Sequence, residues 1–106
     1  DGRMVGFVIG SIESGGVGHV IALGVDPQWR RRGFGRLLME AIEDAFCEHG
    51  ATIARLEVRV DNHVAQALYE KLGYTVTQRL PRYYTNGEDA LLMTKPLPVS
   101  SPDEWM

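Results

Sequence analysis

The chain has few of the residues that build metal sites or crosslinks. Cys47 is its single cysteine, and the three histidines, His19, His49 and His63, are not spaced as His-x-x-x-His. One cysteine cannot form an internal disulfide, and scattered histidines do not supply the ligand set of a zinc site. We therefore expect no disulfide, no metal, and an inert or half-buried thiol at Cys47.

Long apolar runs and a large excess of charge of one sign are also missing. No apolar run approaches the ~20 residues that a membrane span requires, and the net charge is -3. The basic triplet Arg30–Arg32 is therefore a local feature and not part of the broad basic face that nucleic-acid binding requires. No signal-peptide pattern opens the sequence. We expect a cytoplasmic protein with no membrane or nucleic-acid partner.

The hydrophobic pattern predicts a small α/β (α+β) domain. A length of 106 residues with 44% hydrophobic residues is enough for one core. Apolar periodicity and turn signals predict seven elements in the order β-β-α-β-α-β-β. The strands are expected near residues 4–12, 19–25, 53–60, 74–78 and 90–94, and the helices from Gly33 to Gly50 and from Asn62 to Gly73. We assign the domain to residues 1–97 and an irregular tail to residues 98–106.

A basic glycine loop lies between the second predicted strand and the first predicted helix. Glycines let a backbone approach a pyrophosphate closely, and the free N–H groups of a helix's first turn attract anions. The loop therefore predicts a phosphate cradle, with a solvated turn that simply starts a helix as the alternative. The residues concerned are Arg30, Arg31, Arg32, Gly33, Phe34, Gly35 and Arg36.

Two side chains are candidates for proton transfer. Glu57 lies on the polar face of its predicted strand, where it is either a general base in a cleft or a surface carboxylate paired with Arg55 or Arg59. Tyr69 lies on the inward face of its helix, as either a general acid for a departing thiolate or a core aromatic residue. Backbone N–H groups near Leu23 are candidates to polarise a carbonyl.

Adjacent tyrosines mark the loop before the last strand. Tyr83 and Tyr84 are followed by the turn pair Asn86-Gly87 and by Glu88. Aromatic rings and acidic groups on a loop suit the binding of a peptide and its amino group. Packing of the loop on the sheet is the alternative.

Together these segments resemble the GNAT superfamily of N-acetyltransferases, and most sharply its RimI/Ard-type protein N-terminal acetyltransferases. The resemblance is carried by Val25-Asp26-Pro27, the glycine loop, Leu56-Glu57-Val58-Arg59 with Asn62, and Arg82-Tyr83-Tyr84 with Gly87-Glu88-Asp89-Ala90. It implies a mixed sheet and acetyl-CoA as co-substrate. It also implies cofactor contacts by Leu23, Gly24, Val25, the glycine loop and Asn62, Glu57 as base, Tyr69 as acid, and Tyr83 and Tyr84 as peptide contacts.

The resemblance begins after the strand and two helices that open a typical member, so the fold is expected to be amino-terminally truncated relative to the family. It implies acetyl transfer to the α-amine of a protein or peptide by direct attack. The alternatives are a small-molecule or lysine N-acetyltransferase and a CoA-binding module without catalysis. An exposed first strand also predicts self-association.

Overall fold

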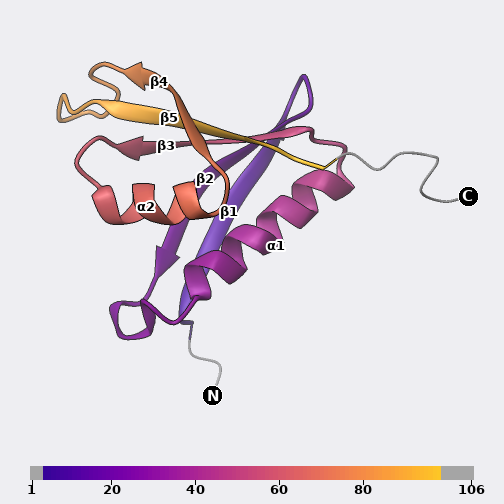
Figure 1. Cartoon of the computed structure of the whole chain (residues 1–106), viewed down its shortest axis with the longest axis horizontal. Helices are drawn as coiled ribbons and strands as arrows, with labels where there is room; N and C mark the ends of the chain where they lie inside the picture. Colours follow the sequence, from indigo (N-terminus) through magenta and orange to yellow (C-terminus); the bar gives the residue numbers. More distant parts are fainter. Residues whose placement is uncertain (1–3, 99–106) are drawn as a thin grey trace, which may run out of the picture.

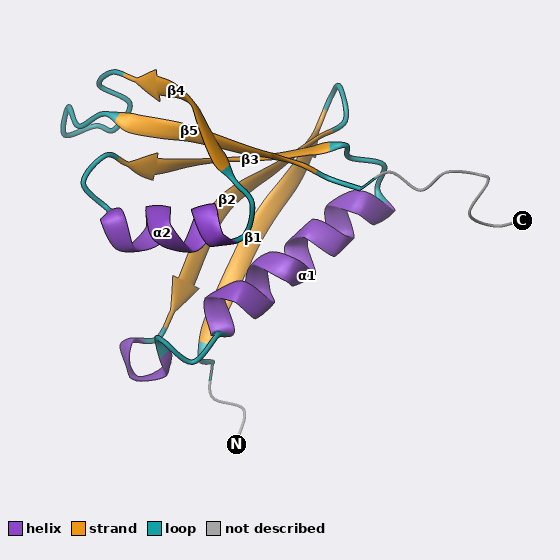
Figure 2. Ribbon diagram, in the orientation of Figure 1, coloured by secondary structure: helices purple, strands orange, loops and turns teal. Residues whose placement is uncertain are grey.

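The computed structural model describes residues 4–98, which form a five-stranded mixed sheet with two helices (Figures 1 and 2). The fold class and the order β-β-α-β-α-β-β predicted from the sequence are confirmed. The strands are β1 (Gly6–Glu13), β2 (Val17–Val25), β3 (Ile53–Arg59), β4 (Thr75–Leu80) and β5 (Ala90–Pro96). The helices are α1 (Phe34–Glu48) and α2 (His63–Lys71), with a short 3-10 helix at Pro27–Trp29.

The strands lie in the order β1-β2-β3-β5-β4, and only β2 and β3 run parallel. Helix α1 makes the crossover between them, as a parallel pair requires. The ladder of β2 and β3 covers only Val17–His19 against Ile53–Arg55. Beyond these residues the two strands diverge, which Figure 2 shows as a widening gap between the β1-β2 half and the β3-β5-β4 half.

The core lies between α1 and one face of the sheet. Phe46 of α1 is buried against Gly18, where a Cβ would lie 2.3 Å from the Phe46 ring, so only glycine fits beneath it. Strand β3 alternates as the sequence predicts, with Leu56 and Val58 buried and Glu57 on the opposite face. The polar face of β3 is therefore directed away from α1 and is available for a site.

A buried polar cluster links α1 to the second half of the sheet. The carboxylate of Glu43 accepts hydrogen bonds from the Tyr74 hydroxyl at 2.8 Å and from Lys95 Nζ at 2.7 Å. Both Glu43 oxygens are thus satisfied inside the core, as a buried carboxylate requires. This cluster ties α1 to β5 on the face of the sheet that α1 covers.

Strand β1 forms one edge of the described sheet and carries exposed apolar side chains. Phe7 and Ile9 are 44% and 51% exposed on the face that α1 does not cover. Self-association through this strand stays a prediction. Within residues 4–98, neither helix has the length and apolarity needed to cross a bilayer. Apart from Pro98, the predicted tail lies outside the described residues.

Candidate active site

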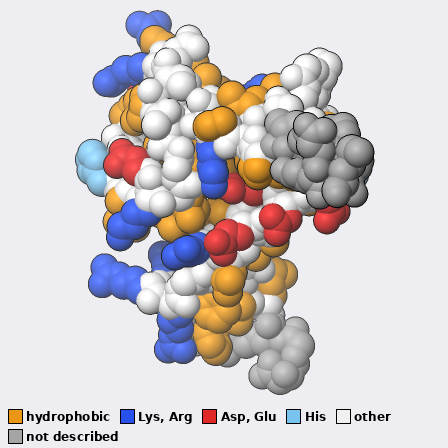
Figure 3. Space-filling model, turned by 45° about the vertical axis from the view of Figure 1, so that its right-hand side comes forward, with side chains coloured by type: hydrophobic (Ala, Val, Ile, Leu, Met, Phe, Trp, Pro, Cys, Tyr) orange, Lys and Arg blue, Asp and Glu red, His pale blue; other side chains and the backbone are white. Residues whose placement is uncertain are grey.

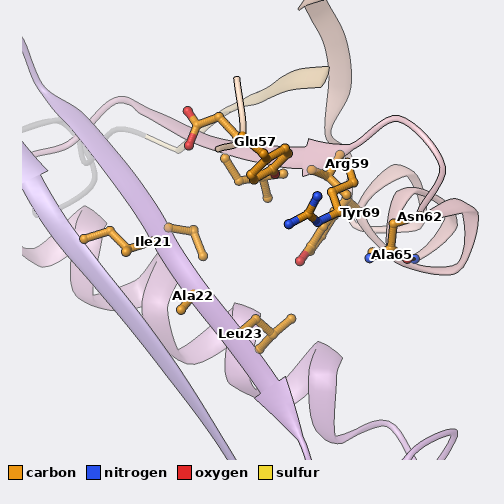
Figure 4. Close-up of a pocket in the computed structure, with 12 residues that line it drawn as sticks. Ile21, Ala22, Leu23, Glu57, Arg59, Asn62, Ala65 and Tyr69 are labelled. Carbon is orange, nitrogen blue, oxygen red and sulfur yellow. Dashed lines mark hydrogen bonds between the residues drawn. The ribbon is translucent and has the colours of Figure 1, made fainter. Parts of the chain in front are cut away.

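A cleft of about 200 Å³ opens where β2 and β3 diverge. Strand β2 supplies one wall, and β3 with the start of α2 supplies the other, as Figure 4 shows. The twelve lining residues are Val20, Ile21, Ala22, Leu23, Leu56, Glu57, Val58, Arg59, Asn62, Ala65, Tyr69 and Tyr84. The structure thus brings together five of the residues predicted from the sequence, namely Leu23, Glu57, Asn62, Tyr69 and Tyr84.

A bulge shapes the β2 wall. Gly10 pairs with Val20 but Ile9 pairs with Ala22, so Ile21 is an extra residue in β2. Bulges bend a strand and redirect its side chains. The bulge lies just beyond His19, the last residue of β2 that pairs with β3. The backbone edge of β2 beyond it faces the cleft instead of a neighbouring strand, and it can offer N–H groups to a ligand.

Glu57 lies in the cleft, but its carboxylate already has a partner. Its Oε1 is 2.7 Å from Nε2 of His19, and its side chain is 11% exposed. Oε2 lies 3.4 Å from Nε of Arg55. Both alternatives drawn from the sequence are therefore found in part: the carboxylate lines a cleft and also pairs with Arg55.

Tyr69 places a phenol in the cleft from α2. Its ring packs edge-on against Tyr74, with centroids 6.0 Å apart, which makes it both a core contact and a lining residue. Burial raises the pKa of the Tyr69 hydroxyl above its ordinary value of 10.0, and the neighbouring Tyr84 raises it further. The hydroxyl therefore keeps its proton at neutral pH, as a general acid must.

Arg59, at the end of β3, contacts the tyrosine loop, which is the segment 81–89 between β4 and β5. The guanidinium of Arg59 lies 4.0 Å from the centroid of the Tyr84 ring, and its Nη1 is 2.8 Å from Oε2 of Glu88. The backbone N–H of Tyr84 also donates to the carbonyl of Glu88 at 3.1 Å. Tyr83 is 49% exposed, and its pKa is raised by burial and then by the Glu57 charge. Of the two tyrosines, only Tyr84 lines the cleft.

The glycine loop offers the geometry that a phosphate group needs. Gly33 has φ 82°, and nothing lies within 4 Å of a Cβ built there. Gly33 also precedes α1 without a side-chain cap, so no capping side chain occupies the first-turn N–H groups of the helix. Figure 3 shows Lys and Arg side chains gathered near this end of the molecule and acidic ones further along α1.

The other predicted cofactor residues, in the glycine loop and at the end of β2, do not line the cleft. Arg30 donates from Nε to the Val25 carbonyl at 3.1 Å, and Arg32 lies over the Trp29 ring at 4.9 Å. Phe34 packs edge-on against Trp29, and Arg36 pairs with Glu40 at 3.5 Å. Gly24, Val25 and Arg30 line a second, more open pocket of about 300 Å³ beside Phe7. Arg31 is exposed, and its backbone is left-handed with φ 64°. The cofactor role of these residues stays a prediction.

His19 is the functional candidate that the sequence analysis missed. It reaches Glu57 because the parallel pairing sets it beside Arg55, two residues before Glu57 on the same face of β3. The signal in the sequence was a histidine on the polar face of a strand, but nothing local indicates which strand lies next to it.

The comparisons with known proteins agree with this geometry. The profile described as "Acetyltransferase (GNAT) family" matches residues 1–74. The chain belongs to this family. It is 40% identical over 109 residues to an N-alpha-acetyltransferase of Sulfurisphaera tokodaii, with 92% of this chain and 65% of that protein covered.

Solved structures extend the likeness to three dimensions. Ard1 from Thermoplasma volcanium superposes with a TM-score of 0.84 at 36% identity, covering 89% of this chain and 64% of that one. Nourseothricin acetyltransferase gives a TM-score of 0.86 at 32% identity, covering 92% and 60%. The NatC complex bound to Gag peptide and CoA matches with a TM-score of 0.78 at 28% identity, covering 89% and 62%. The GNAT chain described here thus spans just under two thirds of the length of these proteins.

Proposed function

We propose that this GNAT domain transfers the acetyl group of acetyl-CoA to the α-amine of a protein or peptide N-terminus. The observation that carries the proposal is the cleft between β2 and β3, which holds a carboxylate at Glu57 and a protonated phenol at Tyr69. Acyl transfer to an amine needs a base for the amine and an acid for the leaving thiolate. The cleft contains a carboxylate that can act as the base and a phenol that can act as the acid.

The donor side of the cleft suits acetyl-CoA. The uncapped N-terminus of α1, the open space at Gly33 and the adjacent arginines fit a pyrophosphate. The unpaired edge of β2 near Leu23 fits the amide groups of an extended pantetheine arm. When bound, acetyl-CoA supplies the acetyl group as a thioester. NatC, a relative solved with CoA and a peptide, supports this assignment.

The chain's own groups supply the proton transfers. Glu57 takes a proton from the arriving amine, directly or through one water, and His19 supports its carboxylate from the other side. The Tyr69 hydroxyl gives its proton to the departing sulfur. The amine attacks the acetyl carbon directly, since Glu57 and Tyr69 serve as base and acid and the cleft is lined by no cysteine or serine.

The α-amine is favoured as the acceptor by the tyrosine loop. Tyr84 lines the cleft and Tyr83 borders Glu57, so a chain end that enters beside them brings its amine towards the base. The relatives named N-alpha-acetyltransferase and Ard1 support this choice. Transfer to a small-molecule amine is the second candidate, because nourseothricin acetyltransferase superposes equally well.

A panel of acceptors tests the proposal. The release of CoA thiol from acetyl-CoA is measured with a peptide bearing a free α-amine, with the same peptide blocked at its α-amine but carrying lysine, and with a polyamine antibiotic. Turnover with the first peptide alone is expected. Preference for the antibiotic or for the blocked peptide contradicts the α-amine assignment, and CoA binding without turnover indicates a module that lacks catalysis.

Cytoplasmic location and the lack of a nucleic-acid partner stay predictions from the sequence.

A further inference from the structure

A buried set of contacts connects Tyr69 to helix α1. The Tyr69 ring packs edge-on against the Tyr74 ring, with centroids 6.0 Å apart and an interplanar angle of 62°. The Tyr74 hydroxyl donates to Oε2 of Glu43 at 2.8 Å, and Oε1 of Glu43 accepts from Lys95 Nζ at 2.7 Å. Tyr74 is 1% exposed and Glu43 is 8% exposed. The phenol that lines the cleft therefore packs on a ring whose own hydroxyl is bound to a carboxylate in the core.

The end of α2 places Tyr74 beside Tyr69. Gly73 follows the helix with φ 102°, a left-handed conformation that glycine adopts without strain and that turns the chain back. The backbone N–H of Tyr74 then donates to the Tyr69 carbonyl at 3.0 Å. The two tyrosines are thus joined by a backbone hydrogen bond as well as by the contact between their rings.

The hydrogen bond to Glu43 sets the orientation of the Tyr74 ring. Burial raises the pKa of the Tyr74 hydroxyl above its ordinary value of 10.0, and the hydrogen bond to Glu43 raises it further, so the hydroxyl keeps its proton and donates. A hydrogen bond to a charged acceptor is roughly twice as strong as one between neutral groups. Lys95 pairs with the other oxygen of Glu43, and its Nζ lies 5.7 Å from the Tyr74 ring centroid. Tyr74 is therefore held at α2 by its backbone and at α1 by its hydroxyl.

We propose that Tyr74 is a positioning residue of the acetyl transfer: through its hydrogen bond to Glu43 it holds the Tyr69 ring, so that the hydroxyl that protonates the leaving thiolate keeps its place in the cleft. This inference rests on the proposed function. Tyr74 does not line the cleft and acts only through Tyr69. Because Glu43 belongs to α1, the same contacts tie the acid to the helix whose N-terminus is assigned to the pyrophosphate.

Tyr74→Phe tests the hydrogen bond, because this variant keeps the ring and removes only the hydroxyl. We expect kcat to fall about 10-fold with both KM values unchanged, since misplacing a catalytic group by about 1 Å can cost about 10²-fold. The control is Phe46→Leu, a buried residue of α1 that packs against Gly10 and Gly18 and does not line the cleft. It weakens the core and should keep wild-type kcat. An unchanged kcat in the folded Tyr74→Phe variant, or equal losses in the two variants, contradicts the proposal.

A double variant separates positioning from general loss of stability. If Tyr74 acts through the Tyr69 hydroxyl, adding Tyr74→Phe to Tyr69→Phe should leave kcat at the value of Tyr69→Phe alone, because the group to be positioned is already gone. If the two losses add, Tyr74 acts on the reaction by another route and the proposal is wrong.

Carbon-13 relaxation of the Tyr69 ring tests the positioning without any substrate. In the wild type we expect the ring to be as rigid as an ordered backbone, with an order parameter of about 0.85, and in Tyr74→Phe to be more mobile. Glu43→Gln, whose amide oxygen can still accept from the Tyr74 hydroxyl, should keep the rigid ring. Equal ring mobility in the wild type and in Tyr74→Phe overturns the proposal. A wild-type chain without activity refutes the proposed function and with it the catalytic part, while the relaxation result still decides whether Tyr74 holds Tyr69.

Discussion

Nε2 of His19 and Oε1 of Glu57 lie 2.7 Å apart although 38 positions separate the two residues in the chain. The pair lies at the point where β2 and β3 stop pairing, so the fold itself creates the contact. Because the Glu57 carboxylate is hydrogen-bonded to the His19 imidazole, we expect the two groups to act together in proton transfer. Two predictions about proton transfer follow from this contact and from Tyr69.

The first prediction concerns coupling between His19 and Glu57. Glu57→Gln should lower kcat about 10²- to 10⁴-fold, the usual contribution of a general base. His19→Ala should also lower kcat, and the double variant should be little worse than Glu57→Gln, because groups that act as a unit are not additive. Steady-state kinetics on the three variants measure this. Additive losses would show that the two residues act independently, and calorimetry should find their acetyl-CoA affinity unchanged.

The second prediction concerns Tyr69 and pH. Burial raises the pKa of its hydroxyl above 10.0. The raised value means that the protonated form persists to higher pH, so the loss of kcat through ionisation of Tyr69 should begin only above pH 10. Tyr69→Phe should lower kcat about 10²-fold at pH 8. If the folded Phe variant has wild-type kcat, another group protonates the leaving thiolate.

The third prediction concerns the attachment of the tyrosine loop. Arg59→Met removes both the contact with the Tyr84 ring and the ion pair with Glu88, so the loop should lose its fixed position beside the cleft. We expect the peptide KM to rise about 10-fold with little change in the KM of acetyl-CoA, since contacts shared by ground and transition state act on KM.

A matched control exists in the same hairpin. Arg79 pairs with Asp89 at 2.8 Å outside the cleft, so Arg79→Met removes a similar ion pair and should leave both KM values unchanged. Equal effects of the Arg59 and Arg79 variants would mean that the loop supports the fold and does not contact the peptide.

The fourth prediction concerns CoA binding. Gly33 and Gly50 both have φ 82° with open space around them, and they lie at opposite ends of α1. Aspartate tolerates this backbone conformation better than most residues do. Gly33→Asp places a negative charge in the phosphate cradle and should weaken CoA binding at least 10-fold by calorimetry, while Gly50→Asp should not. Equal CoA affinities of the two variants would show that the glycine loop does not bind the pyrophosphate.

The fifth prediction concerns self-association. The exposed Phe7 and Ile9, and the position of β1 at the edge of the sheet formed by residues 4–98, favour pairing with another copy. Light scattering should show concentration-dependent growth that Ile9→Lys reduces. Val64→Lys, on an 82% exposed position of α2, is the control. A monomer at every concentration contradicts the prediction.

Much of the fold could be predicted because its signals are local. The alternation around Leu56 and Val58 and the N-cap at Asn62 each depend on neighbouring residues, and both are found in the structure. The 3-10 helix at Pro27–Trp29 was missed because three residues give no periodicity. Strand β5 was predicted two residues short, since the pairing of Lys95 and Pro96 with β3 is set by the tertiary structure.

The site was predictable only where one residue's own position decides its role. Glu57 and Tyr69 were found because each lies on a definite face of its element. The second partner of Glu57, His19, was not predicted, because this contact depends on a register of three residue pairs between strands far apart in sequence. Of the two alternatives for the ion pair of Glu57, Arg55 is the one found, while Arg59 pairs with Glu88 of a loop whose path the sequence does not indicate.

Locating the acetyl group on one peptide that carries both a free α-amine and an internal lysine tests whether the α-amine is the acceptor and Glu57 the base. The peptide is incubated with acetyl-CoA and the wild-type chain, or with the Glu57→Gln variant, and is mapped by tandem mass spectrometry. We expect acetylation of the α-amine by the wild type and at least 10²-fold less by the variant. Acetylation of the lysine, or equal product from both proteins, would contradict this expectation.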